Sequence, residues 1–462
     1  MIRDSEKRLT KMTLVLFDVA LIHLGYITAY WLLKGSVAPL DDAQAVTFMS
    51  AISCFVLYFF GFYTDLKRKG FSQIIYTNIF SLGIVASLFV LGGIYTPMMF
   101  LSLEVVITGC FIHTIFLIGS RFFLWRVIKK IHGMKKVMIF ASDENSGVSL
   151  ANKILSHRKG WFVVSGLVLL NERKKLEDFL EGIDVVLISP SVDEKQRREL
   201  VSLCIKHEKE ALIVPQFFEL FVHGSTPQQV DDKLVLSIPP MKPSRRSRCV
   251  KRAFDLIVSF SILVAISPVM GCLWILIPLT SKGPALFKQE RLGMSGKPYQ
   301  IYKFRSMVRD AEKNTGPVLA VEYDPRITTV GKFLRATRLD ELPQLYNVLK
   351  GEMSLIGPRP ERKYFCDQFQ REFTEYSYRT DVKPGITGLA QVMAKYTTTP
   401  EDKLRFDLLY IRHYSFGNDI KILLQTIRIL FQREQAGGIK VTTQQDEKKL
   451  LQSIVHNQAA GL

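Results

Sequence analysis

The sequence holds few cysteines and few charged residues. Its 462 residues include six cysteines, with no Cys-x-x-Cys pair and no cysteine-histidine cluster at metal-ligand spacing, so we expect reduced, buried cysteines and no disulfide framework. Hydrophobic residues make up 48% and charged residues only 23%, which excludes a disordered chain. Lysine and arginine outnumber aspartate and glutamate by 61 to 43, a formal net charge of +18. This excess favours an anionic partner: nucleic acid, a phospholipid surface or a phosphorylated substrate.

Glycine is scarce where a nucleotide-binding turn would need it. Residues 135–240 alternate short β-rich runs with polar helical stretches, a pattern typical of βαβ units on a parallel sheet. The turn after the first run has a single glycine, Gly147, together with Asp143 and Glu144. Several glycines are needed there to let the backbone approach a pyrophosphate. We therefore predict a Rossmann-like cytoplasmic domain that serves regulation or dimerisation.

Long apolar runs dominate the first third of the chain, at 12–33, 44–63, 74–94 and 98–120. Each has at least the roughly 20 residues that a helix needs to cross a bilayer, so we predict four transmembrane helices. Basic residues precede the first run, follow the second and, from Arg121 onward, follow the fourth, which places both ends in the cytoplasm. Ionisable residues within or near the runs leave membrane transport as a less favoured alternative: Asp18, His23, Glu104 and His113.

A further apolar run, 254–279, is interrupted by Ser267 and Pro268. Proline removes a backbone donor and kinks or breaks a helix. Both flanks of the run are basic, and a crossing helix would export a strongly basic remainder. We predict a re-entrant helix that enters the inner leaflet and returns at Ser267 and Pro268, with a kinked fifth span as the alternative. The basic linker before it, 238–252, is expected to lie on anionic membrane lipids.

Five motifs follow in one order: Lys-Phe-Arg-Ser-Met at 303–307, Asp-Pro-Arg-Ile-Thr at 324–328, Arg-Leu-Asp-Glu-Leu-Pro-Gln-Leu at 338–345, Met-Ser-Leu-Ile-Gly-Pro-Arg-Pro at 353–360 and Lys-Pro-Gly-Ile-Thr-Gly-Leu-Ala-Gln at 383–391. Over residues 250–430 the chain resembles the bacterial sugar transferases, or monotopic phosphoglycosyl transferases. The membrane bundle and Rossmann-like domain resemble those of the large form that initiates exopolysaccharide or capsule repeat units.

The resemblance implies transfer of a sugar-1-phosphate from a UDP-sugar to undecaprenyl phosphate, with release of UMP. The reaction would take place at the cytoplasmic face of the bacterial inner membrane, as the first membrane step of repeat-unit assembly. A second copy of the chain, in a homodimer, is a further expected partner.

The predicted fold class is membrane α plus α/β. It comprises a four-helix transmembrane bundle (1–134), the Rossmann-like domain (135–240), a mostly helical catalytic domain with the re-entrant helix (241–435) and a polar tail (436–462).

Adjacent carboxylates at Asp340 and Glu341 are the candidate catalytic groups. Phosphoryl transfer between two anions needs charge neutralisation and a positioned nucleophile. By resemblance, Asp340 is the nucleophile that forms a phosphosugar-aspartate, and Glu341 is the ligand of a Mg²⁺ cofactor. One or two carboxylates suffice, because Mg²⁺ also takes substrate phosphate oxygens.

Cationic residues complete the predicted site. Arg359 lies between two prolines that restrict its backbone, and its guanidinium suits a pyrophosphate. Lys303 and Arg305 alternate with aromatic residues, so we expect both on one face, binding phosphate or lipid head groups; a basic surface stripe is the alternative. The resemblance adds Gln344 and Lys383 as substrate-binding residues.

Glycines Gly385 and Gly388 suit a tight turn. Leu389 stands where many family members have tryptophan, which leaves the identity of the hexose open. We expect the last helices to lie at the membrane interface with four cations near lipid head groups: Arg405, Arg412, Lys421 and Arg428.

Two other functions are weaker alternatives. A membrane-anchored nucleotide-sugar dehydratase or epimerase would need the missing glycine-rich turn. A non-catalytic scaffold of polysaccharide assembly would not need the Asp340 and Glu341 pair. Nucleic-acid binding is not expected, because the membrane spans give the positive charge a better partner in anionic lipid.

Overall fold

The computed structural model describes residues 2–36, 40–60, 62–63, 71–95, 102–155, 162–170, 176–309, 311, 324–394 and 398–430. The chain divides into two compact units, Met1–Val214 with Thr443–Leu462, and Pro215–Thr442. Residues 215–240, assigned above to the Rossmann-like domain, therefore group with the C-terminal unit. The predicted polar tail lies outside the described residues.

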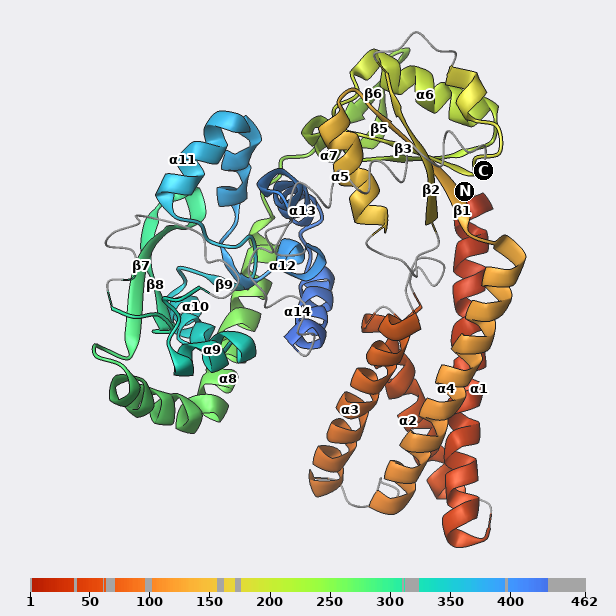
Figure 1. Cartoon of the computed structure of the whole chain (residues 1–462). Helices are drawn as coiled ribbons and strands as arrows, with labels where there is room; N and C mark the ends of the chain where they lie inside the picture. Colours follow the sequence, from red (N-terminus) through yellow and green to blue (C-terminus); the bar gives the residue numbers. More distant parts are fainter. Residues whose placement is uncertain are drawn as a thin grey trace. The chain divides into compact units, whose positions relative to one another are not determined.

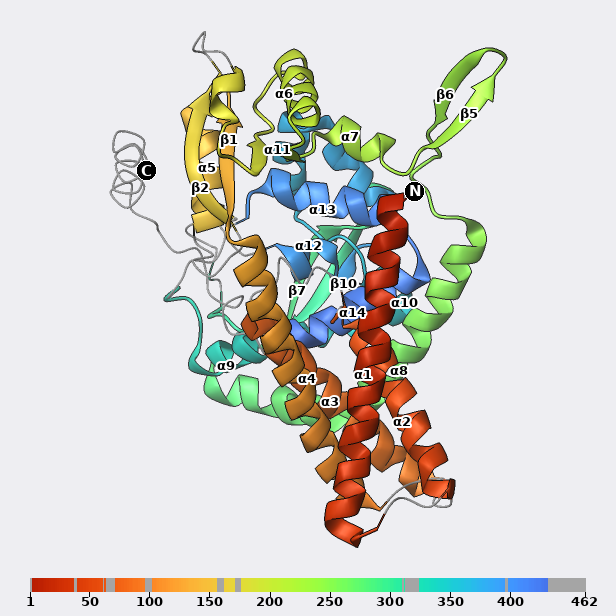
Figure 2. The same cartoon turned by 90° about the vertical axis from the view of Figure 1, so that its right-hand side faces the viewer.

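Four helices open the first unit: α1 (Ile2–Lys34), α2 (Leu40–Phe59), α3 (Phe71–Tyr95) and α4 (Leu103–His132). They coincide with the four apolar runs, and α1 lies along α4 (Figures 1 and 2). Among the described residues, three helical segments are long and apolar enough to cross a membrane: Met12–Lys34, Leu103–Val127 and Arg245–Thr280. The apolar stretches of α2 and α3 are shorter. The chain is a membrane protein.

A buried ion pair joins α1 to α4. Arg121 Nη2 donates to Asp18 Oδ2 at 2.5 Å, and both side chains are fully buried. The guanidinium also lies over the ring of Phe62. Arg121 is therefore an internal residue of α4, and it lies inside the apolar segment Leu103–Val127 instead of after the predicted run 98–120. A charge in such a place is stable only when paired, which Asp18 provides.

Four parallel strands form the sheet of the first unit. The elements are β1 (Lys135–Ala141), α5 (Glu144–Leu155), β2 (Phe162–Leu169), η2 (Leu176–Phe179), β3 (Val185–Ile188), α6 (Glu194–Lys206) and β4 (Glu210–Ile213), in the sheet order β2-β1-β3-β4. The predicted βαβ alternation is confirmed. A Cβ on Gly147 would lie 2.5 Å from a methyl of Leu167, so this glycine lets α5 pack on β2.

The second unit is mostly helical, as predicted. Its elements are α7 (Phe217–Val222), β5 (Thr226–Val230), β6 (Lys233–Ser237), α8 (Arg245–Thr280), β7 (Leu286–Leu292), η3 (Met294–Gly296), β8 (Pro298–Phe304), α9 (Thr329–Thr337), η4 (Leu339–Glu341), α10 (Gln344–Lys350), β9 (Ser354–Ile356), α11 (Lys363–Glu372), η5 (Thr374–Asp381), β10 (Gly385–Thr387), α12 (Leu389–Met393), α13 (Pro400–Arg412) and α14 (Phe416–Leu430). Strands pair as β5 with β6, β7 with β8, and β9 with β10.

Helix α8 continues through Ser267 and Pro268, so the predicted break is a bend within one helix, and Figures 1 and 2 both show α8 changing direction along its length. Pro268 cannot donate to the carbonyl of Val264, and the Ser267 hydroxyl donates to that carbonyl instead, at 2.8 Å. The substitution of a hydroxyl for the missing N–H keeps the carbonyl satisfied at the bend.

The two faces of α8 differ in polarity. Polar side chains recur at helical spacing on the face turned to the protein, where Lys251, Asp255 and Ser259 are buried. Large apolar side chains cover the opposite face, and Ile257 and Leu279 are 67% and 78% exposed. Two cysteines of this helix, Cys249 and Cys272, are also exposed, which corrects the expectation of six buried cysteines. This reversed amphipathicity suits a helix whose outer surroundings are lipid.

Candidate active site

Asp340 and Glu341 occupy η4, a single turn between α9 and α10. Asp324 and Arg326 form an ion pair, and the Thr328 hydroxyl accepts from Gly331 N at 2.9 Å, so this motif starts α9. Arg338 ends α9 in the left-handed conformation, at φ 60°. This change of chain direction after Arg338 turns the next residues toward the protein interior, and Asp340 is only 9% exposed.

Glu341 is held by two cations. Lys303 Nζ donates to Glu341 Oε1 at 2.8 Å, and Arg359 Nη2 donates to the same oxygen at 3.0 Å. Burial alone would raise the pKa of Glu341, but the charges of Lys303 and Arg359 outweigh it and hold that pKa below its usual range. Glu341 is therefore a carboxylate at neutral pH, and the predicted proximity of these three residues is present.

Asp340 lies in a different environment. Its Oδ1 is buried and makes no hydrogen bond within the described part of the chain. Burial and the neighbouring Glu341 raise the pKa of Asp340 to about 6, against the opposing charges of Lys303, Arg335 and Arg338. Adjacent carboxylates thus differ in proton affinity, as acid and nucleophile pairs in active sites do.

The pair also suits a divalent cation. The described residues contain no group of three or more histidine, cysteine, aspartate or glutamate side chains that could enclose a metal. Two carboxylates and an unbonded Oδ1 on Asp340 nevertheless match the partial coordination that proteins offer Mg²⁺, which takes its remaining ligands from water and substrate phosphate.

Arg359 follows β9, whose backbone is packed closely against β10. Strands β9 and β10 run parallel, and their ends pack backbone against backbone. A Cβ on Gly357, Gly385 or Gly388 would lie within 2.3 Å of backbone atoms of the neighbouring segment, so only glycine permits this contact. None of these glycines has a positive φ. The prediction of a tight turn at Gly385 and Gly388 was therefore wrong. These residues are glycines because a side chain there would prevent the backbone of β10 from contacting the segment after β9.

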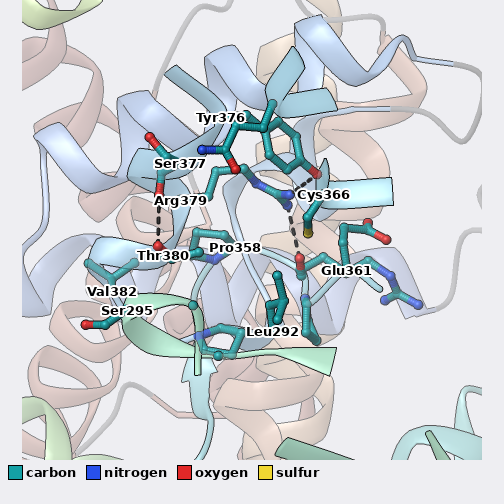
Figure 3. Close-up of a pocket in the computed structure, with 16 residues that line it drawn as sticks. Leu292, Ser295, Pro358, Glu361, Cys366, Tyr376, Ser377, Arg379, Thr380 and Val382 are labelled. Carbon is teal, nitrogen blue, oxygen red and sulfur yellow. Dashed lines mark hydrogen bonds between the residues drawn. The ribbon is translucent and has the colours of Figure 1, made fainter. Parts of the chain in front are cut away.

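Behind Arg359 lies a buried network that the sequence analysis missed. Arg379 Nη2 donates to Arg359 O at 3.0 Å, and Arg379 Nε donates to Asp407 Oδ2 at 2.8 Å. Arg379, Tyr376, Glu361 and Arg359 line a cavity of about 250 Å³. Figure 3 shows the side chain of Arg379 next to that of Tyr376 in this cavity. The available signal was an acidic residue, Asp407, at an apolar helical position, where a charge needs a partner.

Asn347 ties α10 to β8 and so brings Glu341 to Lys303. This fully buried side chain accepts from Tyr302 N at 3.1 Å and donates to Gln300 O at 2.7 Å. Sequence reasoning did not single it out; a polar residue between apolar positions of a short helix was the available signal.

The other three predicted substrate-binding residues make no contact with Glu341 that the described residues show. Arg305 donates to the carbonyls of Ser281 and Lys282 and so caps the end of α8, away from the face of Lys303. Gln344 is buried at the start of α10. Lys383 lies near Gly351, at the opposite end of α10 from Gln344. Because α10 has seven residues, its two ends are roughly 10 Å apart.

Two of the expected interfacial cations bind protein groups. Arg405 is 8% exposed and pairs with Glu401 and Asp402, and Arg412 donates to the carbonyls of His223 and Pro239. Arg405 Nε also donates to Pro215 O at 2.7 Å. This bond and those of Arg412 fix α13 to the segment around α7, so the assignment of both arginines to lipid head groups was wrong. Lys421 is exposed on α14, and the side chain of Arg428 lies outside the described residues.

Fold and site together define a membrane protein with a carboxylate and cation site suited to phosphoryl chemistry. The family model described as bacterial sugar transferase matches residues 246–433. The chain is 49% identical over 134 residues to a putative undecaprenyl-phosphate N-acetylgalactosaminyl 1-phosphate transferase of Bacillus subtilis, covering 29% of this chain and 74% of that protein. The chain belongs to the bacterial sugar transferase family.

Longer relatives match as well. A UDP-N-acetylgalactosamine-undecaprenyl-phosphate N-acetylgalactosaminephosphotransferase of Aeromonas hydrophila is 44% identical over 191 residues, 41% of this chain and 45% of the relative. A UDP-glucose:undecaprenyl-phosphate glucose-1-phosphate transferase of Escherichia coli is 37% identical over 264 residues, 56% of this chain and 57% of the relative. The chain thus spans about half the length of these two relatives.

Proposed function

We propose that the protein transfers a sugar-1-phosphate from a UDP-sugar to undecaprenyl phosphate and releases UMP. The observation that carries this proposal is the buried Asp340 carboxyl, with an unbonded oxygen, beside a Glu341 carboxylate held by Lys303 and Arg359. The names of the Aeromonas hydrophila and Escherichia coli relatives support the same donor and acceptor classes.

In the first half-reaction, a carboxylate oxygen of Asp340 attacks the β-phosphorus of the UDP-sugar. The bond from that phosphorus to the bridging oxygen breaks, and UMP leaves with the bridging oxygen. Arg359 is free to contact a substrate on one side, because its side chain is 43% exposed while bonded to Glu341. Lys303 and Arg359 offset the negative charge that gathers on the phosphoryl oxygens.

In the second half-reaction, a phosphate oxygen of undecaprenyl phosphate attacks the same phosphorus. The Asp340 carboxylate leaves and is regenerated, so the product is a lipid diphosphosugar. The raised pKa of Asp340 makes it a better nucleophile than an exposed carboxylate while leaving it mostly ionised above pH 6.

Mg²⁺ is the proposed cofactor, with Glu341 as its ligand and Asp340 beside it. When bound, the ion would neutralise phosphate charge and favour departure of UMP. Lys303 and Arg359 both donate to Oε1 of Glu341, so they orient the carboxylate for this role.

The bent α8 is proposed to enter and leave the inner leaflet on the same side, with the site at the cytoplasmic face. The change of direction along α8 and its apolar outer face support this arrangement, with a kinked span as the alternative. We also propose that the whole chain acts in exopolysaccharide or capsule assembly. Formation of a homodimer is part of the same proposal.

The test is UMP release from the purified protein in nanodiscs with undecaprenyl phosphate, Mg²⁺ and a panel of UDP-hexoses. We expect multiple-turnover release with at least one donor that depends on the lipid and is lost in Asp340→Asn, whereas without lipid the wild type should release at most one UMP per site. A radiolabelled sugar phosphate should remain attached to the wild-type protein when the lipid is omitted. Absence of release with every donor would favour a non-catalytic scaffold, and release by Asp340→Asn would refute the nucleophile.

A further inference from the structure

The polar face of α8 contacts the segment that carries Arg359. Asp255, 2% exposed, accepts a hydrogen bond from Leu355 N on β9 at 3.1 Å through its Oδ1. One edge of β9 pairs with β10, where Ser354 N donates to Pro384 O and Gly357 N donates to Thr387 O. Leu355 N points to the other edge, where the described residues supply no strand. The carboxylate of Asp255 therefore takes the place of a strand partner.

Backbone groups between Leu355 and Arg359 also make hydrogen bonds to other segments. Ile356 O accepts from the Tyr410 hydroxyl at 3.2 Å. Gly385 N donates to Pro358 O at 2.9 Å, so the backbone just before Arg359 is also fixed. A displacement at Leu355 would thus be passed to Arg359 and to its bond with Glu341, since a segment with satisfied backbone groups moves as a unit.

Helix α8 is also anchored one turn before Asp255, by Lys251 and Arg252. Lys251 Nζ donates to Asp419 Oδ2 at 2.6 Å, and the Tyr410 hydroxyl donates to Asp419 Oδ1 at 2.8 Å. Arg252 donates to the carbonyls of Val348 and Leu349 at the end of α10. The helix is therefore fixed against the segments that follow Glu341 and precede Arg359, and Asp255 makes the direct bond to the second of them.

We propose that Asp255 is a positioning residue for Arg359: its carboxylate fixes β9 against α8, and β9 fixes the guanidinium that contacts Glu341. This role goes beyond membrane anchoring, and its effect on turnover rests on the function proposed above. Asp255 is too deeply buried behind β9 to contact substrate, so it acts through Arg359.

The test is a double-mutant cycle on UMP release, with Asp255→Ala in the wild-type and Arg359→Ala backgrounds. We expect Asp255→Ala to lower kcat/KM by about tenfold in the wild type and by less than about twofold once Arg359 is absent, because coupled residues are not additive. Asp255→Asn keeps an oxygen acceptor for Leu355 N and should stay within about threefold of the wild type. Equal losses in both backgrounds would overturn the proposal.

Amide hydrogen exchange gives a readout that does not require turnover. Peptides covering 353–361 should exchange at least about tenfold faster in Asp255→Ala than in the wild type, while peptides covering β7 stay unchanged. Ser259→Ala is the matched control, because Ser259 is buried on the same face of α8 and its hydroxyl makes no hydrogen bond within the described residues. Unchanged exchange at 353–361 would overturn the proposal, even if the wild type released no UMP.

Asp255→Val provides a second variant if Asp255→Ala does not fold, because valine leaves less empty space than alanine and also removes the acceptor. It should show the same faster exchange at 353–361, and protection equal to the wild type would again overturn the proposal.

Discussion

Lys303 on β8 and Glu341 at the end of η4 are joined by a bond of 2.8 Å between Nζ and Oε1, although 38 residues separate them in the chain. Asn347 makes the meeting possible by binding α10 to the backbone of β8. Burial lowers the pKa of Lys303, while Glu341 opposes that shift. The bond thus stabilises a buried carboxylate and a buried ammonium together.

Replacing Lys303 by methionine should reduce UMP formation about 100-fold, because Glu341 then keeps one cation and the phosphoryl oxygens lose one. Lys303→Arg should restore part of the rate. Initial rates at saturating donor measure both effects. Lys297→Met is the matched control, since Lys297 is exposed at the β7 and β8 turn. A rate within twofold of the wild type in Lys303→Met would contradict the assigned role.

Turnover should follow the ionisation of Asp340. The pKa of Asp340 is raised to about 6, so kcat/KM should rise between pH 5 and pH 7 and then level off. Lys303 lowers this pKa, so Lys303→Met should move the midpoint to higher pH. Profiles of kcat/KM for the two proteins test both points, and a midpoint near pH 4 in the wild type would exclude a buried nucleophile.

Asp340→Asn should stabilise the fold at pH 7.5. The pKa of Asp340 in the folded protein, about 6, exceeds the value near 3.9 expected after unfolding, so ionisation of this carboxyl costs folding free energy as pH rises through that window. Removing the charge should gain up to about 2 kcal/mol at pH 7.5 and little at pH 4.5. Thermal unfolding at the two pH values measures the difference, and destabilisation at pH 7.5 would show that Asp340 is held by favourable contacts.

The requirement of UMP release for Mg²⁺ should change when Glu341 is replaced. Treatment with EDTA should abolish UMP release, and added Mg²⁺ should restore it. Glu341→Gln removes a ligand charge, so the Mg²⁺ concentration for half-maximal rate should rise by about tenfold or more. A titration of rate against Mg²⁺ distinguishes this effect from a simple loss of kcat. Full activity in EDTA would exclude the cofactor.

The sequence predicted the parts of the structure that depend on local patterns. Apolar runs of bilayer length predicted α1 to α4, and alternation of β-rich and helical segments predicted the parallel sheet. Neighbouring carboxylates and a proline-flanked arginine predicted Glu341 and Arg359, which are in contact. These features are readable because each depends on composition or on residues close in sequence.

Contacts between distant residues could not be predicted in the same way. Arg305 and Lys303 alternate in sequence, but β8 ends at Phe304 and the chain then turns toward α8. Arg405 and Arg412 have the spacing of a basic helix face, yet their partners belong to a segment about 190 residues earlier. A cationic side chain does not specify whether lipid or a backbone carbonyl will bind it.

The buried polar face of α8 bears on how the protein is made. Lys251 and Asp255 are buried ionisable side chains, and burial is costly for them unless Asp419 and β9 are already present to receive them. Those partners are synthesised after α8. We therefore expect the helix to settle into the leaflet only after the rest of its unit has been translated and has folded, which makes membrane seating of this unit a late, post-translational event.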